Sequence, residues 1–223
     1  MQPKAFLLDL DGVITDTAQY HYLAWSELCQ TYGFRFSEAD NERLKGVSRM
    51  RSLEIILELN GKQNTYNDAE KQQLTVEKND RYVQMIRQMT PADILPGVSA
   101  FLKDCRQAGI RLAVASASRN APEILRLLGI AHLFDYVADA AKIPNSKPAP
   151  DVFLVCSQAL DLPPACCVGI EDALAGVQAI HAAGMPAVGI RVAPHPVHKP
   201  DIALTSTAEL SLPDLLKQLQ SLS

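Results

Sequence analysis

A strong charge imbalance is missing from this sequence of 223 residues, because 21 lysines and arginines are set against 25 aspartates and glutamates, and the formal net charge is −4. No block of like charge occurs, and no basic patch is interleaved with aromatic residues. Such a chain has little electrostatic attraction for nucleic acid or for an anionic membrane. We therefore expect its partner to be a small molecule.

Long hydrophobic runs are also missing. The first apolar run, Ala5 to Leu8, is interrupted by Asp9 and Asp11, which makes it too short for the core of a signal peptide. No later run approaches the length of a membrane span. The expected location is therefore the cytoplasm.

Cysteine is scarce, and its spacing excludes common zinc and redox motifs. Five cysteines form an odd set without a CxxC pair. We expect reduced, mostly buried thiols. Cys166 and Cys167 lie next to each other in a predicted strand, where alternate side chains face opposite ways, so a disulfide between them would be strained.

Short, continuous apolar runs recur along the chain and are typical of buried parallel strands. Helical patterns, several of them bounded by proline and glycine, separate most of these runs. The sequence therefore predicts an α/β fold with a doubly wound parallel sheet. The predicted strands are Ala5–Leu8, Leu112–Ala115, Ala165–Ile170 and Ala187–Ile190.

Residues 17–90 have a different pattern, with polar helices at about 17–32, 51–60 and 68–89 and no buried-strand run. We interpret this segment as a helical cap domain. It is inserted into an α/β core domain that consists of residues 1–16 and 91–223. The two chain crossings between these domains would form a hinge.

Polar residues follow the predicted strands, at the edge of the sheet where α/β proteins bind ligands. Asp9 and Asp11 follow the first strand, and Glu171 and Asp172 follow a later one. Crowded carboxylates need a cation between them, and ligand sets made only of oxygen favour Mg²⁺ over zinc. Each carboxylate taken alone could instead be a helix cap or a loop residue.

The residues at two further strand ends are suited to binding a phosphate group. Ser116 opens a helix, and a helix N-terminus with hydroxyl groups can bind a phosphate group. Lys147 precedes Pro148, which stiffens the backbone, and a fixed lysine can balance the charge of a phosphoryl group. Taken alone, Ser116 and Ser118 could be caps, and Lys147 could be a solvated surface residue.

In combination, these residues resemble the four motifs of the haloacid dehalogenase superfamily of phosphotransferases. The motifs are DLDGV at 9–13, Ser116, Lys147-Pro148 and Glu171-Asp172. The resemblance implies that Asp9 is the nucleophile, which forms a phospho-aspartate, and that Asp11 is the general acid/base. It also implies that Ser116, Ala117 and Lys147 bind the transferring phosphoryl group.

The same resemblance implies a Mg²⁺ site. Its expected ligands are Asp9, Asp172, Glu171 and the backbone carbonyl of Asp11. We further expect a raised pKa for Asp11, because a general acid must hold a proton in a closed site.

The helical segment resembles the β-phosphoglucomutase family, through residues 9–25, LKGVSR at 44–49, SLEIIL at 52–57 and KNDRYVQMI at 78–86. The likeness continues through TPADILPG, ASASRN and SKPAPDVF, so it covers nearly the whole chain. It implies that a second phosphate is held by Arg49, Ser118, Arg119 and Asn120. It implies sugar-facing positions at Trp25, Gly46, Val47, Ser52 and Lys78, and hinge positions at Thr17 and His21.

The activity that this resemblance implies is an isomerase reaction, the interconversion of β-D-glucose 1-phosphate and D-glucose 6-phosphate. β-Glucose 1,6-bisphosphate would phosphorylate Asp9, and phospho-Asp9 would donate to β-glucose 1-phosphate. Three positions depart from the family pattern: Leu8 replaces phenylalanine, Arg119 replaces lysine, and Ala173 replaces serine after Asp172. A monomer is the expected state, because a core and a cap need no partner.

Three other interpretations of the function stay open at this point. A sugar-phosphate phosphatase of the same superfamily would leave Arg49 and Arg119 without a distal phosphate. A phosphonate hydrolase would need a cap lysine, for which Lys45 or Lys78 could only be suggested by position. A noncatalytic nucleotide-binding module is disfavoured, because no GxGxxG or P-loop motif follows a strand.

Overall fold

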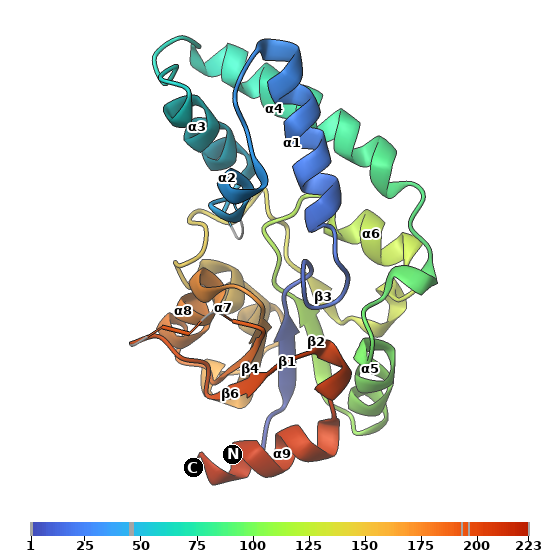
Figure 1. Cartoon of the computed structure of the whole chain (residues 1–223). Coiled ribbons are helices and arrows are strands. Elements are labelled where there is room, and N and C mark those ends of the chain that lie inside the picture. Colours follow the sequence, from blue (N-terminus) through green and yellow to red (C-terminus); the bar gives the residue numbers. More distant parts are fainter. Residues whose placement is uncertain (1, 45–46, 193, 196, 223) are drawn as a thin grey trace. The chain divides into compact units, whose positions relative to one another are not determined.

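The computed structural model describes residues 2–44, 47–192, 194–195 and 197–222 (Figure 1). The chain divides into two compact units, which we describe separately. The α/β unit consists of residues 1–16 and 89–223, and the helical unit consists of residues 17–88. Within the described ranges, no helix is both long enough and apolar enough to cross a membrane.

A six-stranded parallel sheet with the order β3-β2-β1-β4-β5-β6 forms the centre of the α/β unit. The direction of winding reverses at β1, which pairs with β2 on one side and β4 on the other. This topology confirms the predicted doubly wound fold. The strands are β1 (Ala5–Leu8), β2 (Arg111–Val114), β3 (Tyr136–Val137), β4 (Cys167–Glu171), β5 (Ala187–Ile190) and β6 (Ile202–Leu204).

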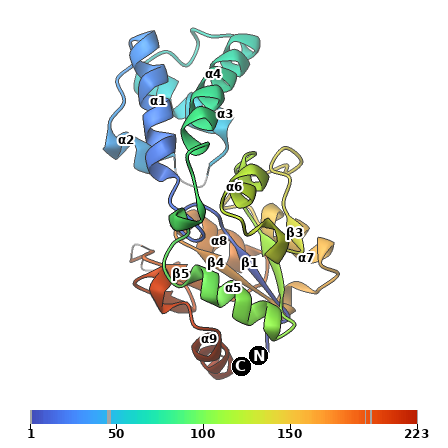
Figure 2. The same ribbon diagram turned by 90° about the vertical axis from the view of Figure 1, so that its right-hand side faces the viewer.

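Helices cover both faces of this sheet (Figure 2). They are α5 (Val98–Gln107), α6 (Ala121–Leu127), α7 (Asp151–Ala159), α8 (Leu174–Ala182) and α9 (Leu212–Ser221). Ala5 and Leu7 of β1 share an apolar cluster with Phe153 of α7 and with residues of α8. Phe6 faces the other way and packs edge to face on Phe101 of α5, with ring centroids 5.0 Å apart. Because strand side chains alternate in direction, β1 is buried on both faces.

The start of β4 differs from the sequence prediction of a strand over Ala165–Ile170. Pro164–Cys166 form a short 3₁₀ helix, and β4 begins at Cys167. Proline at the first position of a helical turn is favourable, and it has no N–H to donate to a sheet.

The five cysteines are free thiols, and all except Cys166 are buried.

The helical unit is built from α1 (Ala18–Tyr32), α2 (Glu38–Glu42), α3 (Arg49–Leu59) and α4 (Asp68–Ile86). An apolar cluster that includes Leu53 and Ile56 forms its core. Helix α3 begins at Arg49 rather than at the predicted Arg51. The reason is that the hydroxyl of Ser48 accepts a hydrogen bond from the backbone N–H of Arg51 and caps the helix.

The two chain segments that lead to the helical unit are held together inside the α/β unit. Thr15 pairs with Ile94 in an antiparallel bridge, and its hydroxyl donates to the carbonyl of Asp93 over 2.7 Å. The backbone N–H of Leu95 donates to the carbonyl of Ile14 over 3.0 Å. The chain therefore leaves and re-enters the α/β unit at adjacent points.

Asp135, just before β3, ties this edge strand to its neighbours. Its carboxylate accepts hydrogen bonds from the backbone N–H of Leu112 in β2 and from Arg106 of α5, each over 2.8 Å. Arg111 pairs with the other oxygen at 2.9 Å. Burial alone would raise the pKa of Asp135, but these hydrogen bonds and positive charges outweigh burial and lower the pKa.

We predict that Asp135→Asn lowers the free energy of unfolding by about 2 kcal/mol near neutral pH, because hydrogen bonds to a charged group are lost. The folded-state pKa of Asp135 lies below its ordinary value of 3.8, so the carboxylate stabilises the fold above that pH. This stabilisation disappears as the pH falls through the folded-state pKa. Urea unfolding of wild type and variant at neutral and at acidic pH measures this effect. If the difference in the free energy of unfolding were the same at the two pH values, the prediction would be wrong.

Candidate active site

The register of the sheet brings three strand ends to one edge. Leu8 of β1 lies opposite Val114 of β2 and Ile170 of β4. The backbone N–H of Asp9 donates to the carbonyl of Ile170 over 3.0 Å, and the N–H of Ala115 donates to the carbonyl of Leu8 over 2.7 Å. The side chains that follow these three strands therefore share the crevice where such sheets bind ligands.

Lys147 lies at the centre of this edge. Its ammonium group is 2.8 Å from Oδ1 of Asp9 and is hydrogen-bonded to Oε1 of Glu171. The lysine side chain is only 2% exposed, and its nitrogen lies 5.3 Å from the ring centroid of Phe153 in α7. The structure thus brings together the predicted nucleophile Asp9, the predicted phosphoryl-binding cation Lys147 and a second, buried carboxylate, that of Glu171.

The charges of this group shift the pKa values of its members. Burial favours a neutral Lys147, but the carboxylates of Asp9 and Glu171 outweigh burial and raise the pKa of the ammonium group. Burial raises the pKa of Glu171, and the carboxylates of Asp9 and Asp172 raise it further, whereas Lys147 lowers it. The ammonium group of Lys147 therefore stays protonated beside these carboxylates.

Asp9, Glu171 and Asp172 form an acidic cluster. One carboxylate oxygen from each lies within 4.8 Å of the others, and this group of potential metal ligands is the one found among the described residues. A Cβ added at Gly12 would lie 2.1 Å from Oδ2 of Asp172, so the turn after β1 approaches that carboxylate closely. A set of oxygen donors with excess negative charge fits Mg²⁺. The carboxylate of Asp11, which is half-buried, is not part of the cluster.

In the segment after β2, serine hydroxyls accept hydrogen bonds from backbone N–H groups of the same segment. The buried hydroxyl of Ser116 accepts from the backbone N–H of Ser118 over 3.1 Å, and the hydroxyl of Ser118 accepts from the N–H of Asn120 over 3.3 Å. Ala117 is half-buried and Arg119 is exposed. Both serines therefore shape the turn that leads into α6, in addition to any contact with phosphate.

In the helical unit, the predicted residues His21, Trp25 and Lys78 lie together. The buried nitrogen of Lys78 is 2.7 Å from Nδ1 of His21 and 5.1 Å from the ring centroid of Trp25. The ring of Tyr82 stacks on His21, with centroids 4.2 Å apart. Burial lowers the pKa of His21 well below 6.5, and the charges of Lys78 and Arg49 lower it further. A neutral His21 accepts the hydrogen bond, because an ammonium group can only donate.

The other predicted cap residues lie in or next to the helices of the helical unit. Trp25 belongs to the apolar core, and Val47 packs against it. The hydroxyl of Ser52 donates to the carbonyl of Ser48 over 3.1 Å. Arg49 is the half-buried first residue of α3, and buried Thr17 immediately precedes α1. Gly46, predicted to face the sugar, lies outside the described residues, as does Lys45.

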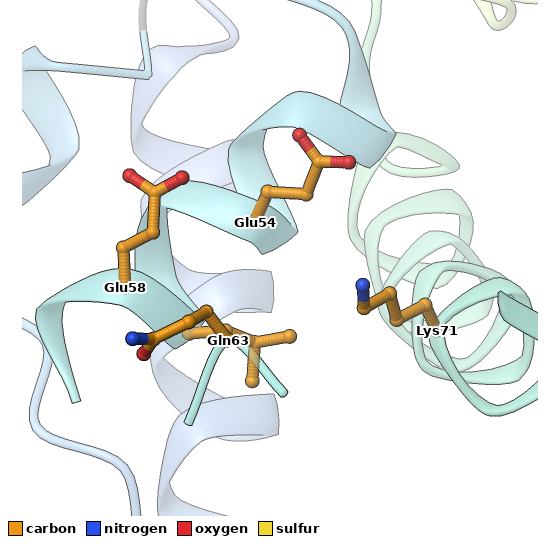
Figure 3. A pocket seen from close by; sticks show the side chains of 5 residues that line it. Glu54, Glu58, Gln63 and Lys71 are labelled. Carbon is orange, nitrogen blue, oxygen red and sulfur yellow. The ribbon is translucent and has the colours of Figure 1, made fainter. Parts of the chain in front are cut away.

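A small pocket of about 140 Å³ lies elsewhere in the helical unit (Figure 3). Its lining residues are Glu54, Leu57, Glu58, Gln63 and Lys71. Arg51 pairs with both glutamates, at 3.1 Å and 2.8 Å. None of the residues predicted for the site lines this pocket. The candidate active site is the acidic cluster of the α/β unit, where Lys147 contacts Asp9.

Three contacts at these sites involve residues that the sequence prediction missed. Tyr82 follows Lys78 by four positions on α4, so helical spacing could have suggested their contact. Phe153 lies beside Lys147 through the tertiary fold, without a local signal. Gly176 of α8 borders the carboxylate of Glu171, and nothing in its spacing from Glu171 indicates that approach.

Comparisons with known proteins identify the class of protein that this fold and site define. The model of the haloacid dehalogenase-like hydrolases matches residues 3–184, and the chain belongs to this family. Within it, the chain is 45% identical to the β-phosphoglucomutase of Bacillus subtilis (strain 168) over 209 residues, which cover 94% of this chain and 92% of that protein.

Two further relatives bear on the function. The crystal structure of β-phosphoglucomutase from Clostridium difficile is 41% identical, has a TM-score of 0.95, and the match covers 99% of both chains. Fructose-1-phosphate phosphatase YqaB of Escherichia coli (strain K12) is 34% identical over 186 residues, which cover 83% of this chain and 95% of that protein. The mutases are thus more similar to this chain than that phosphatase is.

Helix α8 begins without a capping side chain, because Ala173 occupies its N-cap position with extended backbone angles. We predict that Ala173→Ser stabilises the fold by about 1 kcal/mol, since a serine hydroxyl can accept from an N–H of the first turn. For a chain of this size the melting temperature should rise by about 2–4 °C.

The matched control is Ala175→Ser, which makes the same change two positions later, past the N-cap position from which a hydroxyl caps the first turn. Thermal unfolding of the two variants measures the difference. If Ala173→Ser were no more stable than Ala175→Ser, the N-cap explanation would be wrong.

Proposed function

We propose that this protein is a β-phosphoglucomutase that interconverts β-D-glucose 1-phosphate and D-glucose 6-phosphate. The main support is the buried contact between Asp9 and Lys147 beside the acidic cluster. It occurs in a chain that is 45% identical to a β-phosphoglucomutase over most of both lengths. The family resemblance explains the phosphoryl chemistry, and the similarity to the mutases assigns the substrate.

The reaction begins at Asp9. Its carboxylate oxygen attacks a phosphorus atom of β-glucose 1,6-bisphosphate, a P–O bond to the sugar breaks, and phospho-Asp9 forms. Asp11 gives a proton to the departing sugar oxygen. The ammonium group of Lys147, already 2.8 Å from Asp9, balances the charge of the phosphoryl oxygens. In the second half, Asp11 takes a proton from a hydroxyl of β-glucose 1-phosphate, which then receives the phosphoryl group.

Mg²⁺ fits the donor set at this site. Asp9, Glu171 and Asp172 would hold it together with the backbone carbonyl of Asp11. When bound, it supplies positive charge to the phosphoryl oxygens and to the crowded carboxylates. Burial is the main cause of the raised pKa of Glu171, and the neighbouring carboxylates of Asp9 and Asp172 raise it further.

A mutase needs a second phosphate site, because its intermediate carries two phosphates. We assign this site to Arg49 of the helical unit and to Ser118, Arg119 and Asn120 of the α/β unit. A guanidinium group binds phosphate through two parallel hydrogen bonds, which a lysine cannot form. Arg119, where the family has lysine, should therefore hold the distal phosphate in a more directional way.

The helical unit would act as a cap over the substrate. Trp25, Gly46, Val47, Ser52 and Lys78 are its proposed sugar-facing positions. Thr17 and His21 are the proposed hinge residues. Closure of such a cap excludes water, so that phospho-Asp9 reacts with a sugar hydroxyl rather than being hydrolysed. We further propose that the protein is a cytoplasmic monomer.

The alternative is a sugar-phosphate phosphatase, which the 34% identity to fructose-1-phosphate phosphatase YqaB favours. It would use the same nucleophile and cation but transfer the phosphoryl group to water. A phosphonate hydrolase would need a cap lysine that forms a Schiff base, and no observation at Lys78, which contacts His21, favours that role.

The test of the function is Mg²⁺-dependent conversion of β-glucose 1-phosphate to glucose 6-phosphate with trace β-glucose 1,6-bisphosphate, followed beside the release of inorganic phosphate. We expect isomerisation well above phosphate release, and its loss in Asp9→Asn, because an amide cannot form an acyl phosphate. Phosphate release without isomerisation would instead establish the phosphatase.

Arg49 offers a separate prediction for the distal phosphate. Arg49→Ala should raise KM for β-glucose 1-phosphate by about 10- to 100-fold, because a hydrogen-bonded charge contact contributes about 1.5–3 kcal/mol. Arg51→Ala is the matched control on the same helix, since Arg51 pairs with Glu54 and Glu58 instead. Its kinetics should match wild type. If the two substitutions raised KM equally, Arg49 would not be a ligand of the distal phosphate.

A further inference from the structure

The carboxylate of Glu171 is engaged on both of its oxygens. Oε1 accepts a hydrogen bond from the ammonium group of Lys147. Oε2 accepts from the backbone N–H groups of Asp172 and Ala173, over 3.1 Å and 3.2 Å. The residue is only 1% exposed. Glu171 therefore connects the cation of the site to the start of α8, where Ala173 offers no capping side chain.

The space for this carboxylate exists because residue 176 has no side chain. Gly176 lies in the first turn of α8, and a Cβ added there would lie 1.9 Å from Cδ of Glu171 and 2.1 Å and 2.4 Å from its two oxygens. Heavy atoms that are not bonded cannot approach so closely. The atoms in the way are the end of a side chain, so an added methyl group would displace the carboxylate rather than the backbone.

Backbone conformation does not explain the glycine. Gly176 is not among the glycines with positive φ, so its backbone angles are accessible to alanine. Inside a helix, alanine is also more favourable than glycine. The approach of Glu171 is thus the feature that requires glycine at this position.

We propose that Gly176 is a positioning residue for phosphoryl transfer, because it lets Glu171 hold Lys147 against Asp9. This inference deepens the proposed function and rests on it for the identity of the reaction. Gly176 itself touches no reacting atom. It acts through the carboxylate of Glu171, whose displacement would release Lys147 and the backbone N–H groups of Asp172 and Ala173.

The first variant to test is Gly176→Ala. We expect kcat to fall by about 10- to 100-fold, the range typical for residues that orient the primary groups of a site. KM for β-glucose 1-phosphate should change little, because the distal phosphate contacts are untouched. Amide hydrogen exchange at Asp172 and Ala173, followed by NMR, should become faster, which a general loss of stability alone would not confine to these two groups.

Gly169→Ala is the matched control in β4. A Cβ added there would lie 2.4 Å from the Ile180 side chain, so the substitution disturbs the packing of the same strand on the same helix. It does not touch the carboxylate of Glu171. We expect a lower melting temperature, with kcat and the exchange of the two amides close to wild type.

A double variant makes the route of the effect testable. In a Glu171→Ala background the clash is gone, so adding Gly176→Ala should cause no further fall in kcat and should restore folding if the single variant is unstable. Wild-type kcat and amide exchange in Gly176→Ala would overturn the proposal, as would a further loss of activity or of folding in the double variant. If the wild-type protein does not isomerise the sugar phosphate, the proposed function fails, yet phosphate release and amide exchange still test Gly176.

Discussion

The buried ammonium group of Lys147, held between the carboxylates of Asp9 and Glu171, is the interaction on which the rest of the site depends. Three negative groups gather at the end of β1 and β4, and burial makes their mutual repulsion expensive. Lys147 offsets part of this repulsion, and a bound cation would offset the remainder. The same charge balance that keeps the folded site intact therefore prepares it for its substrate.

Some side chains of this site have more than one structural role. Glu171 ends a strand, contacts the lysine and accepts from the backbone N–H groups of Asp172 and Ala173, just before the following helix. In the helical unit, the buried nitrogen of Lys78 has contacts of another kind, which include Nδ1 of His21 and the ring faces of Trp25 and Tyr82. Opposite charges therefore hold Lys147, whereas a histidine ring and two aromatic faces contribute to the position of Lys78.

Much of the fold could be predicted from the sequence, because strands buried on both faces are continuous apolar runs. The two- and three-residue strands Tyr136–Val137 and Ile202–Leu204 could not, since they are too short to show a pattern. The gathering of Asp9, Glu171 and Asp172 follows from parallel strands that end at one edge. The approach of Phe153 to Lys147 and of Gly176 to Glu171 depends on how α7 and α8 pack, which no local pattern records.

The bridge between Thr15 and Ile94, reinforced by the hydrogen bond from Leu95 to Ile14, has an evolutionary consequence. It fixes the two open ends of the α/β unit next to each other, whatever is inserted between them. A segment whose own ends are close together can then be exchanged without rebuilding the sheet. New substrate preferences could therefore arise by replacing residues 17–88 as a module, while the phosphoryl chemistry stays encoded in the remaining chain.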